Sequence, residues 1–433
     1  MANLQWYKGS GRLIPSGDWE VGAGCETPGG AVSRDAEFIS SMALKRANCA
    51  VELMRCLKRL RDPQSELILL RSCMGVAKLP FGIRTCQPSL VGGAVSVFDE
   101  GLRGALEDIV VCGGAFFGDL QWRLASLPTR FGGLEICTAE DASSYAFVAS
   151  RAKSWGLQDH ILRECGGDVL DSDYRSALDL LHSSLPDLDI GGFYIKDTAP
   201  PKSQKILVNA LYGEIVKRFE EKFVLSPRQR VVFECLRAPH AQDFPSVAPI
   251  EGLGQHMSAV KYRAMLRYRL MIPLFPVDES CPVCRKRVWI LSASTRSTVK
   301  SCQEVHLTLG GHPYFLIGRG KHACVDLTGV SPLVGLKDKG FVVGQAVLMA
   351  EASKVTKHEK ACLENQRVFV SFAFDTFGGL ASDVVRLLNR AQKVVNSNSS
   401  SLKVSNFVFS IIGFSIQKGV AAQLVARLPA IAL

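Results

Sequence analysis

The chain has 433 residues and a formal net charge of +10 at neutral pH, with 51 Lys and Arg against 41 Asp and Glu. Its hydrophobic content of 47% excludes a disordered tail, because that much apolar surface can build buried cores. The length corresponds to two or three domains of about 150 residues each. The basic excess favours polyanionic partners, such as nucleic acid or an anionic membrane surface.

Targeting and membrane signals are not recognisable in the sequence. The opening MANLQWYKGSGRL lacks the apolar segment of a signal peptide. The most apolar long run, 407–428, is interrupted by Gln417, Lys418 and Arg427, so we expect no membrane span. These features predict a protein of the nucleus or cytoplasm that does not insert into membranes.

The 14 cysteines are spread along the chain and do not form a dense framework. Scattered buried thiols are typical of proteins in a reducing compartment. Three of the cysteines lie in segments with helical apolar spacing, and we expect them to be buried: Cys49, Cys56 and Cys73.

Helical patterns dominate the first two thirds of the chain. Residues 1–35 are rich in Gly, Ser and Pro and lack a period, which predicts irregular structure. A helix is predicted over 38–60, ended by Asp62-Pro63, and a second helix is predicted to begin at Ser65 as N-cap. The apolar stripe of the first helix comprises Met42, Ala43, Ala47, Ala50, Val51, Met54 and Leu57. Further helices are expected near 95–108, 140–153, 172–183, 203–223 and 227–237.

The segment 258–271, SAVKYRAMLRYRLM, predicts a short helix in which basic residues alternate with tyrosines. Such side chains can hold a phosphate backbone and stack on bases. The candidate nucleic-acid-binding residues are therefore Lys261, Tyr262, Arg263, Arg267 and Arg269. The alternative is a solvated basic face over a core stripe, and the sequence leaves both interpretations open.

The pattern changes after Cys281. HACVDLT at 322–328 alternates, with Ala323, Val325 and Leu327 on one face, and RVFVSFAF at 367–374 predicts a second strand. Helices are expected over 343–365, 381–395 and 405–427, with a polar linker at 396–401. The predicted fold class is therefore mixed, with a mainly α-helical first two thirds followed by a small α/β domain.

Several catalytic classes lack their sequence signatures. A palm-type polymerase needs paired carboxylates for two metal ions, and the chain contains no Asp-Asp dipeptide. Kinase and P-loop motifs are missing as well. Cys281-Pro-Val-Cys284 supplies two thiolates that fit one edge of a tetrahedral zinc site. The later candidates for the other two ligands, Cys302, His306 and His312, match no standard spacing.

Asp326 lies inside a short apolar strand, where a charge is costly unless it has a partner or a task. Lys354, Lys357 and Lys360 follow on a predicted helix. A strand carboxylate that holds Mg²⁺, with a lysine that stabilises the attacking hydroxide, is the core of restriction-enzyme-type nucleases. The alternative is an edge-strand aspartate beside a solvated basic helix face.

Several strings together resemble the C-terminal part of plant LINE-like, non-LTR retrotransposon polyproteins. They are GGAVSRD (29–35), LLRSCMGVAKLPFGIRTCQP (69–88), FFGDLQWRLASLP (116–128), ECLRAPHAQDF (234–244), KHACVDLTGVSPL (321–333) and KGVAAQLVARLP (418–429). These polyproteins place a reverse transcriptase first, then a helical thumb and connector, a zinc knuckle, and a restriction-like endonuclease last. The resemblance covers about residue 29 to the C-terminus, apart from the segment that follows Cys284.

The resemblance implies a domain order and site roles. Gly29 to Asp35 would be the exit of a palm that lies upstream of this chain. Residues 36–275 would be the thumb and connector, 276–320 a disrupted zinc knuckle, and 321–433 a partial restriction-like endonuclease. It also implies individual roles: knuckle ligands Cys281 and Cys284, endonuclease carboxylate Asp326, catalytic lysine Lys354 or Lys357, and His358 where relatives often carry an aromatic residue.

The departure from the family pattern is equally informative. Asp326 follows Cys284 by only 42 positions, which is too short for the rest of the knuckle and the first endonuclease carboxylate. Leu309 and Gly311 fall about where the Pro and Asp of that element are expected. We interpret the segment as a knuckle that lost its second half, since two thiolates cannot close a structural Zn²⁺ site.

Three functions are compatible with the sequence. The first is a retrotransposon-derived, non-catalytic fragment that binds DNA or RNA. The second is an active Mg²⁺-dependent DNA endonuclease, which needs a second carboxylate, with Glu351 and Asp338 as poorly placed candidates. The third is a non-catalytic protein-interaction module. No small-molecule substrate is indicated, and the sequence does not determine an oligomeric state.

Overall fold

The computed structural model describes most of the chain outside its N-terminus and residues 275–322. The described residues are 25–26, 31–33, 35–75, 80–113, 116–162, 172–195, 199–274, 323–333, 340–398 and 406–428. The Cys281–Cys284 pair, the whole segment 276–320 and Asp338 lie outside them.

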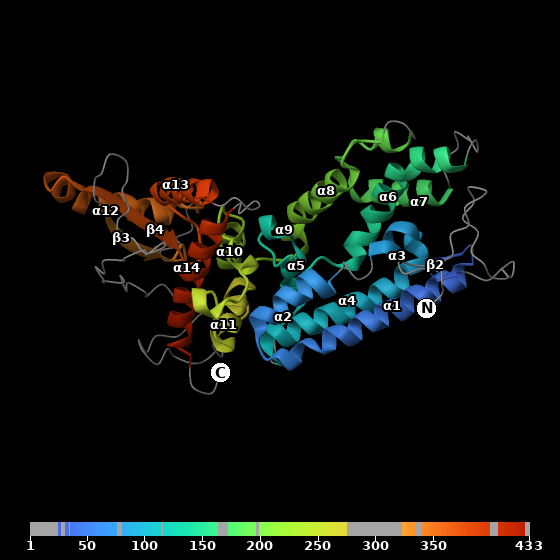
Figure 1. The fold of residues 1–433 in the computed structure, drawn as a ribbon, viewed down its shortest axis with the longest axis horizontal. Helices are drawn as coiled ribbons and strands as arrows, with labels where there is room; N and C mark the ends of the chain where they lie inside the picture. Colours follow the sequence, from blue (N-terminus) through green and yellow to red (C-terminus); the bar gives the residue numbers. More distant parts are fainter. Residues whose placement is uncertain are drawn as a thin grey trace. The chain divides into compact units, whose positions relative to one another are not determined.

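The described residues are mostly helical and include two small two-stranded sheets (Figure 1). This confirms the coarse fold class, with the parallel sheet in the last quarter of the chain. Two compact units divide the chain, and they interleave in sequence. Unit 1 comprises Met1–Glu52, Val76–Gly101 and Ala139–Leu211, and unit 2 comprises Leu53–Gly75, Leu102–Thr138 and Tyr212–Leu433. The sequence, by contrast, suggests consecutive divisions at 35, 275 and 320.

Unit 1 is built from helices and one antiparallel pair of two-residue strands. The strands β1 (Cys25–Glu26) and β2 (Ala31–Val32) lie in the segment that we predicted to be irregular. The helices are α1 (Ala36–Arg55), α3 (Pro80–Thr85), α4 (Pro88–Val111), α6 (Ala139–Leu162), α7 (Ser172–Ser184) and α8 (Ser203–Lys217). The last turns of α1, α4 and α8 belong to unit 2.

Unit 2 contains shorter helices and the parallel sheet. Its helices are α2 (Pro63–Leu69), α5 (Asp119–Ser126), α9 (Phe219–Lys222), α10 (Pro227–Leu236), α11 (Ala259–Arg269), α12 (Gln345–Glu364), α13 (Ser382–Asn398) and α14 (Phe407–Val425). Its strands are β3 (Ala323–Val330) and β4 (Val368–Asp375). Short turns of 3₁₀ helix occur at Leu57–Leu60, Thr129–Phe131, Phe244–Ser246 and Glu251–Leu253, and a π turn at Leu70–Met74 follows α2.

Two local features hold the helices of unit 1 together. At Gly101 the helices α1 and α4 approach closely, since a Cβ there would lie 2.4 Å from a methyl of Val51. The Asp99 carboxylate accepts hydrogen bonds from the backbone N–H groups of Ala139 (2.7 Å) and Glu140 (3.0 Å) at the start of α6. It therefore satisfies donors that a helix N-terminus leaves free.

The start of α2 differs from the prediction. Asp62 is the N-cap and its carboxylate accepts from Ser65 N at 3.1 Å, while Pro63 occupies the first helical position. Proline is favoured there because its missing N–H has no helical partner and its fixed φ suits the helix. Asp62-Pro63 therefore both ends the preceding segment and begins the next helix, and Ser65 is not the cap.

Burial of the cysteines also differs from the prediction. Cys49, Cys56 and Cys73 are exposed, whereas Cys86 and Cys235 are buried. The apolar stripe of α1 places Ala47, Ala50, Val51, Met54 and Leu57 inside, as predicted. Cys49 and Cys56 lie between these positions, and their side chains therefore point away from the core.

Arg269, at the end of α11, is the central buried charge of unit 2. Its side chain is 2% exposed, and its guanidinium donates to Phe377 O (2.9 Å) and Ala241 O (2.7 Å) while lying over the Phe244 ring at 4.8 Å. One residue earlier, Tyr268 bonds Thr376 Oγ1 at 2.9 Å. These contacts attach α11 to the turn that follows β4.

That turn, Asp375–Gly379, is organised by a buried carboxylate. Asp375 Oδ1 accepts from the backbone N–H groups of Phe377 (2.8 Å) and Gly379 (2.9 Å). Gly378 has φ +101°, which favours glycine, and a Cβ at Gly379 would lie 2.4 Å from Asp375 Oδ2. The turn therefore requires this Asp and both glycines.

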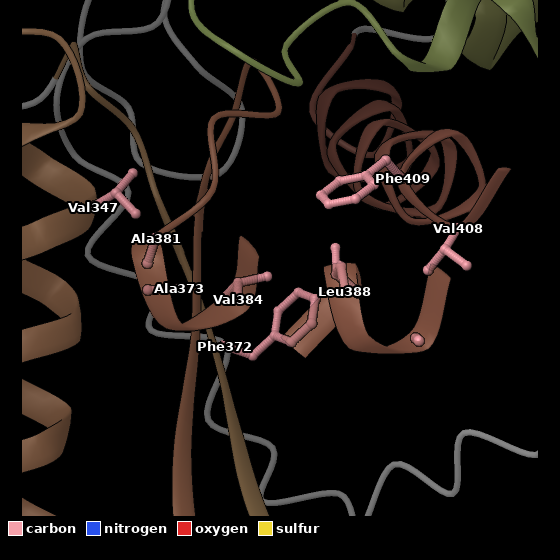
Figure 2. Close-up of a cluster of buried hydrophobic side chains, with 9 residues drawn as sticks. Val347, Phe372, Ala373, Ala381, Val384, Leu388, Val408 and Phe409 are labelled. Atoms are coloured by element: carbon pink, nitrogen blue, oxygen red, sulfur yellow. The ribbon is translucent and has the colours of Figure 1, made fainter. Parts of the chain in front are cut away.

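The parallel sheet and its helices form an apolar cluster (Figure 2). Phe372 and Ala373 of β4, Val384 and Leu388 of α13, and Val408 and Phe409 of α14 are buried together with Val347 of α12. Val325 and Leu327 of β3 pack against this cluster, as the strand alternation predicted.

Helix α14 is the one described helix whose length and composition would allow it to cross a membrane. Half of its apolar window is buried, and its buried residues include Phe409, Phe414 and Leu424. Gln417 is also buried in the same helix. A helix that packs one side into the core of a protein has the same length and composition as a membrane span, and the buried residues of α14 fit that arrangement.

Replacing Arg269 with Met should destabilise unit 2 by about 3 to 5 kcal/mol, because two buried carbonyls and Asp375 lose their cationic partner. Urea unfolding followed by circular dichroism measures the effect. The matched control is Arg390→Met on α13, whose side chain is exposed. Equal, small losses in both variants would contradict the central position of Arg269.

Burial raises the pKa of Asp375 to about 6, although backbone N–H groups and Arg269 oppose the shift. The pKa of an unfolded aspartate is about 3.9. Between these values the folded state keeps a proton that the unfolded state has released, so stability falls as pH rises. From pH 4 to pH 7 the free energy of unfolding should fall by about 2 to 3 kcal/mol relative to Asp375→Asn. A pH-independent difference between the two proteins would refute this.

Candidate functional site

One face of the β3–β4 sheet is polar where it meets α12. The strands are parallel, with Asp326 opposite Ser371 and Cys324 opposite Phe369. Side chains alternate along a strand, so Cys324, Asp326 and Thr328 share one face of β3. We call this face, with the α12 residues that cover it, the β3–α12 seam.

Asp326 is paired within the seam. Lys354 Nζ lies 2.8 Å from Asp326 Oδ2, and His358 Nε2 lies 3.7 Å from the same oxygen. The exposed fractions of the Asp326 and Lys354 side chains are 17% and 25%. Lys354 and His358 are four residues apart and therefore lie on one side of α12. The His358 ring also contacts Phe369 of β4, with 5.7 Å between ring centroids.

The structure distinguishes between the two candidate lysines. Lys354 contacts Asp326, whereas the side chain of Lys357 is exposed. Lys357 is three residues after Lys354 and could lie on nearly the same side of α12. The positions of α12 that face β3 are those of Lys354 and His358, so Lys357 points to solvent. The Asp326 carboxylate therefore has two nitrogen neighbours, Lys354 Nζ and His358 Nε2.

Glu351, the candidate second carboxylate, has a different partner. Its Oε1 accepts from Asp383 N at 3.2 Å, and Ser382 Oγ donates to Oε2 at 3.5 Å. It therefore caps the start of α13, where negative charge is favoured. In the described part of the chain no three His, Cys, Asp or Glu side chains are grouped as metal ligands. The described donors of the seam, one carboxylate neutralised by a lysine, do not fit the oxygen-rich shell that Mg²⁺ requires.

Two hydroxyls on the polar face have no hydrogen-bond partner among the described residues. They are Ser371 Oγ, on a residue with 0% exposure, and Thr328 Oγ1. Buried hydroxyls without partners are costly and uncommon. The sequence marks Ser371 as unusual, because it interrupts the apolar run VFVSFAF. That Ser371 lies opposite Asp326 follows only from the strand register.

The predicted nucleic-acid-binding helix, α11, has its side chains committed elsewhere. Tyr262 and Arg269 are buried, at 1% and 2% exposure. Arg263 Nε donates to Ile109 O (3.1 Å), and Arg267 donates to Val110 O (3.2 Å) and Val111 O (3.1 Å). Cations stabilise the free carbonyls at the end of a helix, here α4. Of the five residues, only Lys261 is both partly exposed and without a described contact with another residue.

A different helix presents basic side chains to solvent. Arg386, Arg390 and Lys393 are exposed on α13 and fall on one side of it, spanning about 10 Å of helix axis. Arg386 pairs with Asp383, while Arg390 and Lys393 have no carboxylate partner among the described residues. We call these three residues the basic face of α13. The sequence already contains the spacing i, i+4, i+7 of these three residues. Only the structure shows that the opposite side of α13 is buried and that this side is exposed to solvent.

Comparison with known proteins gives no assignment. No protein-family model matches this sequence, and no curated protein matches it.

The Asp326–Lys354 pair should contribute a coupling energy of about 1 to 2 kcal/mol to stability, because both groups are mostly buried. A double-mutant cycle with Asp326→Asn and Lys354→Met, followed by urea unfolding, measures it. The control cycle replaces Lys354→Met with Lys357→Met and should give a coupling near zero. A coupling to Lys357 equal to that of Lys354 would contradict the observed pairing.

Proposed function

We propose that this chain is a non-catalytic nucleic-acid-binding protein, derived from a LINE-like retrotransposon polyprotein. The single observation that carries the binding activity is the basic face of α13. Its three cations are exposed, and two of them have no carboxylate partner among the described residues. The retrotransposon origin rests on the sequence strings and their order.

Phosphate recognition fits this face on physical grounds. Exposed Arg and Lys side chains bind phosphates and release condensed counterions, which gives affinity without sequence preference. Asn389 is also exposed on this side and can donate to phosphate or sugar oxygens. The apolar side of α13 is anchored by Val384 and Leu388, so the basic side chains project from a rigid element. The net charge of +10 acts in the same direction.

The endonuclease is the second candidate, and the 2.8 Å contact between Lys354 and Asp326 favours it. In nucleases of that type, however, the carboxylate must be available to a cation, together with a second acid. Glu351 caps α13, and Lys354 already neutralises Asp326. These two observations support a seam that stabilises the fold and does not cleave.

Removing the two unpartnered cations of α13 should weaken nucleic-acid binding. Arg390→Gln/Lys393→Gln should lose roughly ten-fold in affinity for a labelled 20-mer DNA duplex at 0.1 M salt. The salt dependence, log Kobs against log[salt], should become shallower by about 1.5 to 2. The matched control is Lys357→Gln/Lys360→Gln, which removes the same charge from α12, where Glu359 and Glu364 lie nearby in sequence. Equal losses in both variants would refute the α13 interface.

The same samples distinguish the alternatives. Incubation of the protein with supercoiled plasmid and Mg²⁺ or Mn²⁺ should leave the plasmid intact. Nicking that disappears in Asp326→Ala would establish an endonuclease and refute the non-catalytic proposal. No salt-dependent binding to DNA or to an RNA of equal length would favour a protein-interaction module.

A further inference from the structure

Two cysteines meet at the far end of the β3–α12 seam. Cys324 is the second residue of β3, and Cys362 lies in the last turn of α12. The two thiols are neighbours, and the Cys324 thiol contributes to the raised pKa of Cys362. Both side chains are partly exposed, so a small solute can reach them. Two half-exposed thiols in contact, on different elements, form a site quite unlike the scattered cysteines elsewhere in the described chain.

Arg367 joins the two cysteines. Its backbone N–H donates to Cys362 O at 2.9 Å, and its side-chain Nη1 lies 3.9 Å from Cys324 Sγ. The strand β4 begins at the next residue and runs beside β3, with Cys324 opposite Phe369. The backbone on both sides of the thiol pair is therefore held by regular hydrogen bonding.

The two sulfurs have different surroundings. Cys324 Sγ lies 3.9 Å from Arg367 Nη1, so the guanidinium can stabilise the hydroxide that leaves when this sulfur attacks the O–O bond of a peroxide. Burial and the neighbouring Cys324 thiol raise the pKa of Cys362, and Arg367 opposes this. Cys362 is therefore more often protonated and reacts more slowly with an oxidant, because the thiolate is the nucleophile, and this makes it the second of the two thiols to react.

We propose that Cys324 and Cys362 are a peroxide-sensitive dithiol that closes to a reversible intramolecular disulfide. Cys324 sulfur attacks one oxygen of hydrogen peroxide, the O–O bond breaks, and a sulfenic acid and one water form. Cys362 sulfur then attacks the sulfenic sulfur, the S–O bond breaks, and the hydroxyl leaves with the thiol proton as a second water. The two cysteines lose two electrons, and the peroxide is reduced to two waters.

The disulfide would tie the end of α12 to β3 and enclose the helix in a covalent loop. Residues 324 and 362 are 38 positions apart, and closing a loop of that length restricts the unfolded chain. The bond would also hold Lys354 and His358 over Asp326, because all three lie within the loop. Oxidation would thus stabilise the sheet and α12 without involving the basic face of α13.

Peptide mapping tests the proposal on the full-length protein. The chain is treated with hydrogen peroxide, remaining thiols are alkylated, and trypsin is added without reductant. Tryptic peptides 322–337 and 361–367 each contain one cysteine. They should appear as one linked species, two hydrogens lighter than their sum, which dithiothreitol separates. Linkage of either cysteine mainly to a different partner, or Cys324 recovered as sulfinic acid without linkage, would overturn the proposal.

Two further measurements separate this site from general oxidation. The oxidised protein should melt about 5 °C higher than the reduced protein, and Cys362→Ser should abolish that rise, whereas the exposed-cysteine control Cys49→Ser should keep it. Arg367→Gln should slow linkage several-fold with the same final yield. An unchanged rate would show that the guanidinium does not activate Cys324, and a rise in melting temperature that persists in Cys362→Ser would refute the disulfide.

Discussion

Unit 2 depends on a charge that has no access to water. The Arg269 guanidinium is enclosed between α11, the loop at Ala241 and the turn after β4, and each of these supplies an oxygen or a ring to it. A buried cation is tolerated only when its donors are satisfied, so the surrounding backbone must keep one arrangement. Asp375 organises the same turn through backbone N–H groups. The attachment of the α/β region to the rest of unit 2 follows from this pair of buried charges.

The β3–α12 seam also contains a paired charge, but its side chains are more exposed than Arg269. Asp326 is placed in a strand and neutralised by Lys354 from the helix that connects the two strands. The Ser371 hydroxyl lies opposite Asp326 and the Thr328 hydroxyl follows it along β3, both without described partners, while the thiols and Arg367 lie at the other end of the face. The polar residues share this face of the sheet with Phe369 and Ala373 of β4, which lie opposite Cys324 and Thr328. Such a face can carry chemistry, and in this chain the thiols are the part best arranged for it.

Much of the local structure could be predicted, whereas the site could be predicted only in part. The period of α1 identified its buried residues, and the alternation of β3 placed Val325 and Leu327 in the core. The choice of Lys354 over Lys357 was not available, because it depends on how α12 rotates against β3. Basic residues of α11 resembled a nucleic-acid-binding face, yet Arg263 and Arg267 cap α4, more than 150 residues earlier in the chain.

The sequence by itself determined where most of the long helices and the two strands of the parallel sheet lie, and which apolar residues of α1 and β3 face a core, because these properties depend on residues within a few positions of one another. The tertiary structure decided what each charged or reactive side chain does. Asp326 and Lys354, or Cys324 and Cys362, become partners only when distant segments pack, and a charge is defined by the groups around it. For the same reason, burial of Arg269 and exposure of Arg390 follow from packing, although the two residues are chemically identical.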